Sequence, residues 1–222
     1  MLHLRVLGEF SVTVDGRPEP VPASRPARNV LAWLAVHPGV HARSEVAALL
    51  WPDVLDSSAR TSLRSALVKV TRCVGPGYVI ATRETVGLDA QCVEVDLGRF
   101  WTAVDSERLA EAWDVGRGPL LPGFDEDWVH GARAELRNRV AGVLDGLAGA
   151  AEESGDLAAA VGWTRTVIER DPLSEQRVRA LMLRPMMRCT PSGSPTGGGA
   201  LAARTGTRRT SSPPASAAQR LR

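Results

Sequence analysis

The sequence has few cysteines, a single lysine and no long apolar run. Its 3 cysteines are widely spaced, without a Cys-x-x-Cys pair or a neighbouring histidine, so neither a disulfide scaffold nor a zinc site is indicated. The longest apolar run, Val30 to Val36, is far shorter than the ~18 residues of a membrane span. The start, Met1 to Asp15, lacks the basic, apolar and small-residue regions of a secretory signal. These absences predict a cytoplasmic protein with no membrane partner, metal or cofactor.

The composition is that of an ordinary globular chain, with 44% apolar and 23% charged residues among 222. Lys69 is the one lysine among 27 basic residues, which indicates the base composition of the gene more than selection at each site. The net charge of +2 is uneven, because residues 1–98 are neutral, residues 99–184 carry −4 and residues 185–222 carry +6. We expect these three segments to be two domains and a tail.

The first 89 residues carry the pattern of a winged helix. Up to residue 22, apolar and polar side chains alternate around the turn dipeptide Asp15-Gly16, which predicts a small antiparallel sheet. Apolar stripes at helical spacing then predict three helices, at 28–37, 45–51 and 57–74. Ser44 is a candidate N-cap of the second helix, and Ser57 or Ser58 of the third. A β-hairpin is predicted next, with strands at 78–82 and 86–89.

The third predicted helix has one apolar face and one polar face. Leu63, Leu67, Val70 and Val74 fall within about a 60° arc. No acidic residue occurs from Ser57 to Arg83, and such a basic stripe is typical of a nucleic-acid contact because neutralised phosphates release counterions. A solvated helix face is the alternative. The major groove of DNA admits one α-helix, whose arginines and lysines can donate to guanine. The residues predicted to contact DNA are Arg60, Thr61, Arg64, Ser65, Val68, Lys69, Arg72 and, on the hairpin, Arg83.

The second half predicts helices. A helical pattern from Phe100 is interrupted by the loop at 116–123, and a long amphipathic helix follows from Phe124 to Leu147. Further helices are predicted at 157–170 and from 171 onward, which suggests a tetratricopeptide-like array. The acidic triplet Asp125, Glu126 and Asp127 could be a metal or catalytic cluster, but acids in a first helical turn also complement the helix dipole. We favour the dipole interpretation.

Several phrases in this order resemble a known family. Leu4-Arg-Val-Leu-Gly-Glu-Phe10, Leu31-Ala-Trp-Leu-Ala35 and Leu50-Trp-Pro-Asp53 are similar to the OmpR-type DNA-binding domain of the Streptomyces antibiotic regulatory proteins, the SARP family. Arg117-Gly-Pro-Leu-Leu-Pro-Gly-Phe124, with Trp128 and Arg133, and then Asp171-Pro-Leu-Ser-Glu175 are similar to the bacterial transcriptional activation domain that follows it. The resemblance covers residues 1 to about 183.

The resemblance implies an α+β winged helix-turn-helix domain at 1–98 and an all-α tetratricopeptide-like domain at 99–184. It also implies a pathway-specific activator of antibiotic biosynthesis genes that binds direct repeats of double-stranded DNA as a homodimer and recruits RNA polymerase holoenzyme at the nucleoid. By position, helix 57–74 matches the recognition helix and 78–89 the wing. Lys69 stands where the family usually has an arginine, which provides a planar fork that lysine lacks.

The chain departs from the family after Met182. Residues 185–222 are rich in Gly, Ser, Pro, Thr and Ala, with 6 arginines and no acid, a composition that predicts a disordered tail and an incomplete activation domain. A shifted reading frame or truncated gene is one hypothesis for its origin. A basic arm that adds non-specific DNA affinity is the other.

Other residues indicate no further chemistry. The 4 histidines form no metal pair, and the 6 tryptophans, which could be base-stacking platforms, lie on apolar helical faces where core packing is favoured. No nucleophile elbow or phosphate-binding glycine loop is present in the sequence, so we expect no enzyme. Two alternatives to an activator remain: a helical-repeat adaptor for protein partners, and a degraded regulator without DNA-binding activity.

Overall fold

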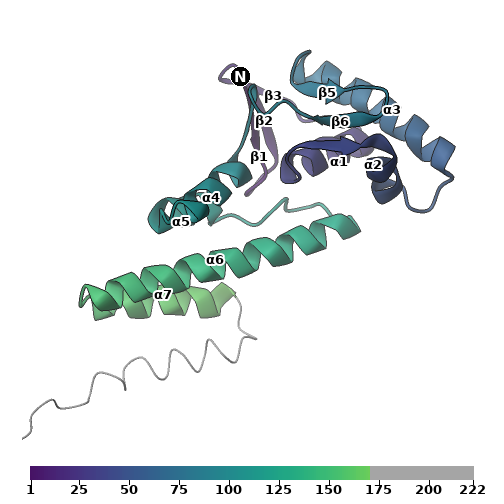
Figure 1. Cartoon of the computed structure of the whole chain (residues 1–222). Coiled ribbons are helices and arrows are strands. Elements are labelled where there is room, and N and C mark those ends of the chain that lie inside the picture. Colours follow the sequence, from purple (N-terminus) through teal and green to yellow (C-terminus); the bar gives the residue numbers. More distant parts are fainter. Residues whose placement is uncertain (171–222) are drawn as a thin grey trace, which may run out of the picture.

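A computed structural model of the chain describes residues 1–170. An N-terminal part of strands and three helices lies above a helical half (Figure 1). The expected winged helix followed by a helical domain is confirmed. The predictions of a helix from residue 171 and of a disordered tail at 185–222 lie outside the described residues.

The first sheet begins with a strand that buries alternate side chains. Leu2 and Leu4 are buried and pair with Val14 and Val12 across an antiparallel ladder, as the alternating pattern predicts. The last strand was not predicted. It pairs in parallel with the first strand, which lies more than eighty residues earlier in the chain. Three residues are too few to show the periodicity from which such a non-local strand could be predicted. The sheet order is β3-β2-β1-β7, from β1 (Leu2–Arg5), β2 (Ser11–Val14), β3 (Arg17–Glu19) and β7 (Val93–Val95).

Three helices pack against one another beside this sheet: α1 (Arg25–Val36), α2 (Arg43–Leu50) and α3 (Asp56–Val74). All three were predicted, with ends that differ by up to three residues. The capping predictions were wrong, because the N-cap positions are Ala42 in α2 and Leu55 in α3, and neither makes a side-chain cap bond. The backbone N–H of Arg43 instead donates to the carbonyl of Glu84. This tertiary hydrogen bond satisfies a backbone N–H group in the first turn of α2, as a serine cap would have done.

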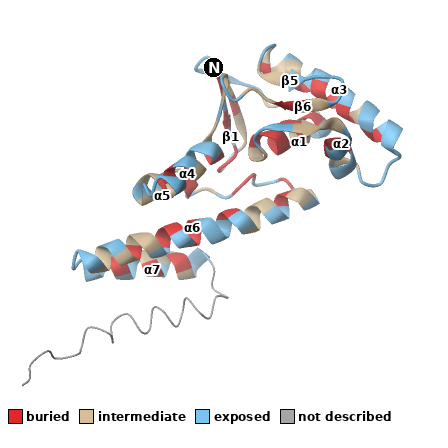
Figure 2. Cartoon of the chain, in the orientation of Figure 1, coloured by how far each residue is buried: buried red, intermediate tan, exposed pale blue. Residues whose placement is uncertain are grey.

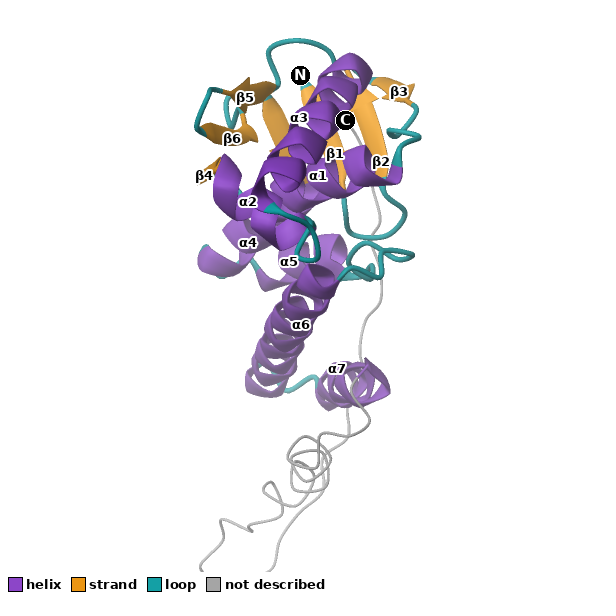
Figure 3. Cartoon of the chain, turned by 90° about the vertical axis from the view of Figure 1, so that its right-hand side faces the viewer, coloured by secondary structure: helices purple, strands orange, loops and turns teal. Residues whose placement is uncertain are grey.

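The wing is a small sheet of order β4-β6-β5, made by β4 (Val40–Ala42), β5 (Val79–Ala81) and β6 (Thr85–Leu88). The predicted hairpin is confirmed, and β4 is an addition that the sequence pattern did not indicate. Gly87 permits this pairing, since a Cβ there would lie 2.4 Å from the carbonyl oxygen of Gly39. Figure 3 shows the wing beside one end of α3.

The second half contains two helical pairs: α4 (Asp96–Asp105) with α5 (Leu109–Gly116), and α6 (Asp127–Glu153) with α7 (Leu157–Arg170). The expected continuous helix after Phe100 was wrong, because the chain turns at Glu107, whose φ is 56°. The long helix starts at Asp127, three residues later than expected, since Phe124 packs edge-to-face on Phe10 at 5.6 Å instead of entering the helix.

One hydrophobic core runs through both halves (Figure 2). Asp96, the first residue of α4, accepts hydrogen bonds from the backbone N–H groups of Val6 and Leu7 at 2.9 and 3.0 Å. Leu7 also forms a β-bridge with Leu120 in the loop before α6. The winged-helix half and the helical half are therefore joined by backbone pairing as well as by apolar packing.

Candidate nucleic-acid interface

α3 is two-faced because its apolar residues recur every three or four positions. Leu63, Val70 and Val74 are at most 2% exposed and face α1 and α2. The opposite face is exposed and carries five of the residues predicted to contact DNA: Thr61, Arg64, Ser65, Val68 and Arg72. In Figure 1, α3 and β5 lie at the end of the molecule away from α6 and α7, so this face is not covered by the helical half.

The cations of α3 differ in their surroundings. Arg60 lies 4.0 Å from the carboxylate of Asp56 one turn earlier, and Lys69 turns aside, its Nζ 3.4 Å from Ser24 Oγ at the start of α1. Arg64 and Arg72 make no hydrogen bond or ion pair within residues 1–170. Their guanidinium groups are therefore the ones with donors available at the centre of the face.

The wing places Arg83 at the turn between β5 and β6, where it is exposed. The turn is ordered by Thr82, whose hydroxyl accepts hydrogen bonds from the N–H groups of Glu84 and Thr85 at 3.2 and 2.9 Å. The backbone of the turn that carries Arg83 is therefore held in one conformation. Figure 3 shows the wing strands β5 and β6 in the same upper part of the molecule as α3.

Arg43 is a cation of this surface that the sequence analysis missed. Its Nη1 donates to the Thr82 carbonyl at 2.8 Å, which ties the start of α2 to the wing turn. Arg43 also lines an open hollow of about 320 Å³ between α3 and β5, together with Arg64 and Val68. Arg43 was missed because β4, which directly precedes it and pairs with β6, was not predicted. Without that strand, the sequence offers no reason to place Arg43 next to the wing.

The acidic triplet does not form a site of its own. Glu126 is the N-cap residue of α6, and its Oε1 accepts hydrogen bonds from Asn29 Nδ2 at 2.5 Å and Arg25 Nε at 3.1 Å, both on α1. Partial burial alone raises the pKa of the Glu126 carboxyl, but the hydrogen bonds from Asn29 and Arg25 outweigh it and hold that pKa below its ordinary value. The dipole interpretation therefore missed the main role of Glu126, which is to connect α6 to α1.

The aromatic residues at this junction pack as expected. His37 stacks on Trp33 with ring centroids 4.5 Å apart and meets Trp128 edge-on at 5.9 Å. Burial lowers the pKa of His37. Within residues 1–170 there is no group of three His, Cys, Asp or Glu side chains placed to hold a metal ion, and no helix there is long and apolar enough to cross a membrane.

Comparison with known proteins finds a family match for the helical half. Residues 96–186 match the family model of the bacterial transcriptional activator domain. The helical half is therefore similar to a bacterial transcriptional activator domain. That domain begins where the structure starts α4, at Asp96, and its match extends beyond the described residues. No curated protein matches the chain.

A solved structure with a similar fold is that of Mycobacterium tuberculosis EmbR in complex with a low affinity phosphopeptide. The two share 21% sequence identity and superpose with a TM-score of 0.65, over 82% of this chain and 53% of the EmbR chain. This chain therefore spans about half the length of that neighbour. The activator-domain match over residues 96–186 and the shared fold together support the resemblance to SARP-type transcriptional activators.

Proposed function

We propose that this SARP-type regulator binds double-stranded DNA in a sequence-specific way, with α3 in the major groove. The observation that carries the proposal is the exposed, acid-free face of α3, on which Arg64 and Arg72 have no partner within residues 1–170. Arginine can donate two parallel hydrogen bonds to O6 and N7 of guanine. Thr61 and Ser65 add hydroxyl groups that can bond to bases or phosphates, and Val68, 53% exposed, can contact a thymine methyl group.

The remaining cations are proposed to position the protein on the DNA backbone. Arg60 and Lys69 lie at the flanks of the α3 face, where a phosphate can replace their present partners, Asp56 and Ser24. Arg83 at the wing turn is proposed to contact the adjacent phosphates or the minor groove. Such contacts give affinity that falls with salt but little sequence preference.

We further propose that the protein activates transcription by recruiting RNA polymerase holoenzyme. The end of α2 and the loop that follows it support a protein contact there, because Leu49 on α2 and Val54 and Leu55 in the loop are exposed by 46%, 46% and 79%. Large apolar side chains grouped at the surface are typical of interaction sites. Their place directly before α3 would present them next to bound DNA.

By its resemblance to the SARP family, we propose that the regulated genes belong to one antibiotic or other secondary-metabolite pathway. The same resemblance supports binding of direct repeats by two copies of the chain, and action at the nucleoid in the cytoplasm. The domain limits proposed for this function are 1–98 for DNA binding and 99–184 for activation, with 185–222 as a tail.

A salt-titrated gel shift of the full chain tests the proposal, with promoter fragments from neighbouring genes and competitor DNA. We expect one fragment to be retained over competitor. The single variants Arg64→Glu and Arg72→Glu should each weaken that retention, while the matched charge reversal Arg165→Glu on α7 keeps it. No retention of any fragment would overturn the DNA-binding proposal. It would favour an adaptor for protein partners or a degraded regulator.

A further inference from the structure

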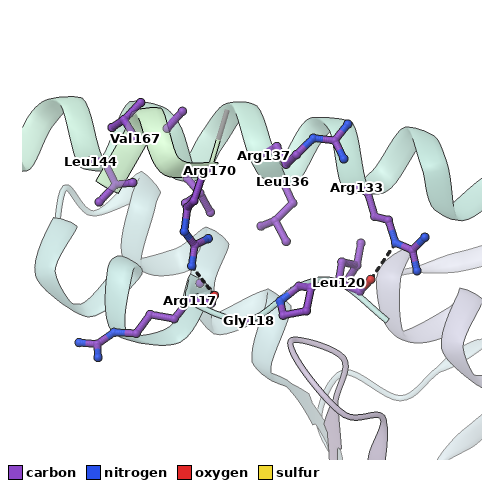
Figure 4. A pocket seen from close by; sticks show the side chains of 13 residues that line it. Arg117, Gly118, Leu120, Arg133, Leu136, Arg137, Leu144, Val167 and Arg170 are labelled. Atoms are coloured by element: carbon purple, nitrogen blue, oxygen red, sulfur yellow. Dashed lines mark hydrogen bonds between the residues drawn. The ribbon is translucent and has the colours of Figure 1, made fainter. Parts of the chain in front are cut away.

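A pocket of about 380 Å³ lies in the activator domain, between α6, α7 and the loop that precedes α6. Pockets of about 300 to 1,000 Å³ with mainly apolar linings are typical of small-molecule sites. The floor is apolar, and Figure 4 shows Leu120, Leu136, Leu144 and Val167 around it. Leu120, Leu144 and Val167 are at most 2% exposed, so this floor is part of the packed core.

The polar groups of the pocket all have one sign of charge. Its lining includes Arg117, Arg133, Arg137 and Arg170 and no acidic residue. Arg170 reaches across from α7 to donate to the carbonyl of Arg117, and its guanidinium carbon lies 4.8 Å from the centroid of the Trp113 ring. This contact fixes the guanidinium but uses one of its five N–H donors.

The four arginines are not equivalent. Arg133 already donates to the carbonyls of Leu120, Leu121 and Phe124, and Arg117 pairs with Asp114. Arg137 is exposed at the rim and makes no hydrogen bond or ion pair within residues 1–170. An anion in the pocket would therefore be bound by Arg137 and by the remaining donors of Arg170.

We propose that this pocket binds a small amphipathic anion, a carboxylate that carries a short hydrocarbon chain. The chain lies on the apolar floor, where removal of its surface from water is favourable. The carboxylate lies at the arginine rim, where charge-assisted hydrogen bonds are stronger than neutral ones. Neither a neutral apolar molecule nor a cation fits both features.

The site would also connect to the DNA-binding half. Its loop wall is hydrogen-bonded to the segment that follows β1, since Gly8 N–H donates to the Pro119 carbonyl and Leu121 N–H donates to the Val6 carbonyl, both at 2.8 Å. Gly118 fits tightly there, because a Cβ would lie 2.9 Å from the backbone nitrogen of Gly8. A ligand held against this loop thus contacts the segment that joins the two halves.

Titration of the full chain with sodium decanoate, below the concentration at which it forms micelles and without DNA, tests the site. Calorimetry should show saturable binding of one decanoate per chain, and tryptophan emission should change because Trp113 lies under Arg170. The neutral analogue decanol should bind about tenfold more weakly, as expected for loss of a charge-assisted hydrogen bond. Arg137→Glu should weaken decanoate binding by about tenfold or more.

The matched control is Arg165→Glu, which makes the same change of charge at an exposed position of α7 outside the pocket and should leave decanoate binding unchanged. Val140→Phe, which fills the floor, should weaken decanoate and decanol alike. The proposal is overturned by an absence of saturable binding, by equal binding of decanol and decanoate, or by equal effects of the two charge reversals. Because no DNA is present, these outcomes are independent of the DNA-binding proposal.

Discussion

Asn29 on α1 donates a hydrogen bond to Glu126, the N-cap residue of α6, at 2.5 Å between Nδ2 and Oε1. The two residues lie 97 positions apart in the chain and belong to different halves of the molecule. Arg25 donates to the same oxygen. The N-terminus of α6, the long helix of the helical half, is therefore held by the first turns of α1 in the winged-helix half.

Replacement of Glu126 by glutamine should weaken this junction. The variant loses the negative charge that both donors face, and we expect the free energy of unfolding to fall by about 1 to 3 kcal/mol, the range for a part-buried hydrogen bond to a charged group. Urea unfolding followed by tryptophan emission measures the change. Asp125→Asn is the control, because Asp125 is exposed and outside this contact; an equal loss in both variants would contradict the role of Glu126.

The same contact predicts a dependence on pH. The pKa of Glu126 is lower in the folded protein than its ordinary value of 4.5, so its contribution to stability is complete above about pH 4.5 and is lost as the pH falls through the folded pKa. The difference in unfolding free energy between the wild type and E126Q should therefore shrink on acidification. If the difference in unfolding free energy stays constant from pH 6 to pH 3, the ionised Glu126 carboxylate does not stabilise the fold.

Arg133 should be intolerant even of lysine. Its Nε and Nη2 donate to the carbonyls of Leu120, Leu121 and Phe124 at 2.5 to 2.9 Å. The single ammonium group of Arg133→Lys cannot reproduce this planar fork, so we expect about 1 to 3 kcal/mol of lost stability from carbonyls left without a donor. Arg139→Lys, on the same helix but over the Trp101 ring, is the control and should unfold close to wild type in a urea titration.

Much of the fold could be predicted from local patterns. The alternation of Leu2 and Leu4 and the apolar stripe of α3 are set by neighbours in sequence, and both elements formed as expected. The strands β4 and β7 were missed because each has 3 residues and exists through a partner more than forty positions away. The capping serine of α2 failed for a related reason, since the backbone N–H of Arg43 donates instead to the carbonyl of Glu84 in the wing turn.

The candidate site was predicted as a set of residue types on one helix face. Periodicity alone places Ser65, Val68 and Arg72 on the exposed face of α3, and the structure agrees. It could not show that Lys69 leans toward Ser24 or that Arg43 reaches the wing turn, since both contacts depend on how α1, α2 and β6 pack. Whether these residues contact DNA stays a prediction.

Arg43→Ala should loosen the wing more than it destabilises the protein. Removal of the guanidinium frees the Thr82 carbonyl, which is at the surface and can bond to water, so the stability loss should stay below about 1 kcal/mol, as for most exposed contacts. Hydrogen exchange should quicken at Glu84 and Thr85, whose amides are fixed by Thr82. Unchanged exchange at these two amides would show that the hydrogen bond from Arg43 to Thr82 does not order the wing turn. Arg17→Ala on β3, outside the wing, is the control.

Arg72→Ala and Lys69→Ala should differ in their effect on DNA binding. Arg72 has no partner within residues 1–170, so loss of a base contact should cost about 1 to 3 kcal/mol and relax specificity at one position. Lys69 is held near Ser24 at the flank, and its loss should weaken binding evenly across sequences and reduce the salt slope by about one unit, as for a phosphate contact. Fluorescence anisotropy with the retained promoter fragment and a scrambled one, at several salt concentrations, separates the two effects. Arg165→Ala should change neither quantity, whereas unchanged binding in both α3 variants would mean that α3 is not the recognition helix.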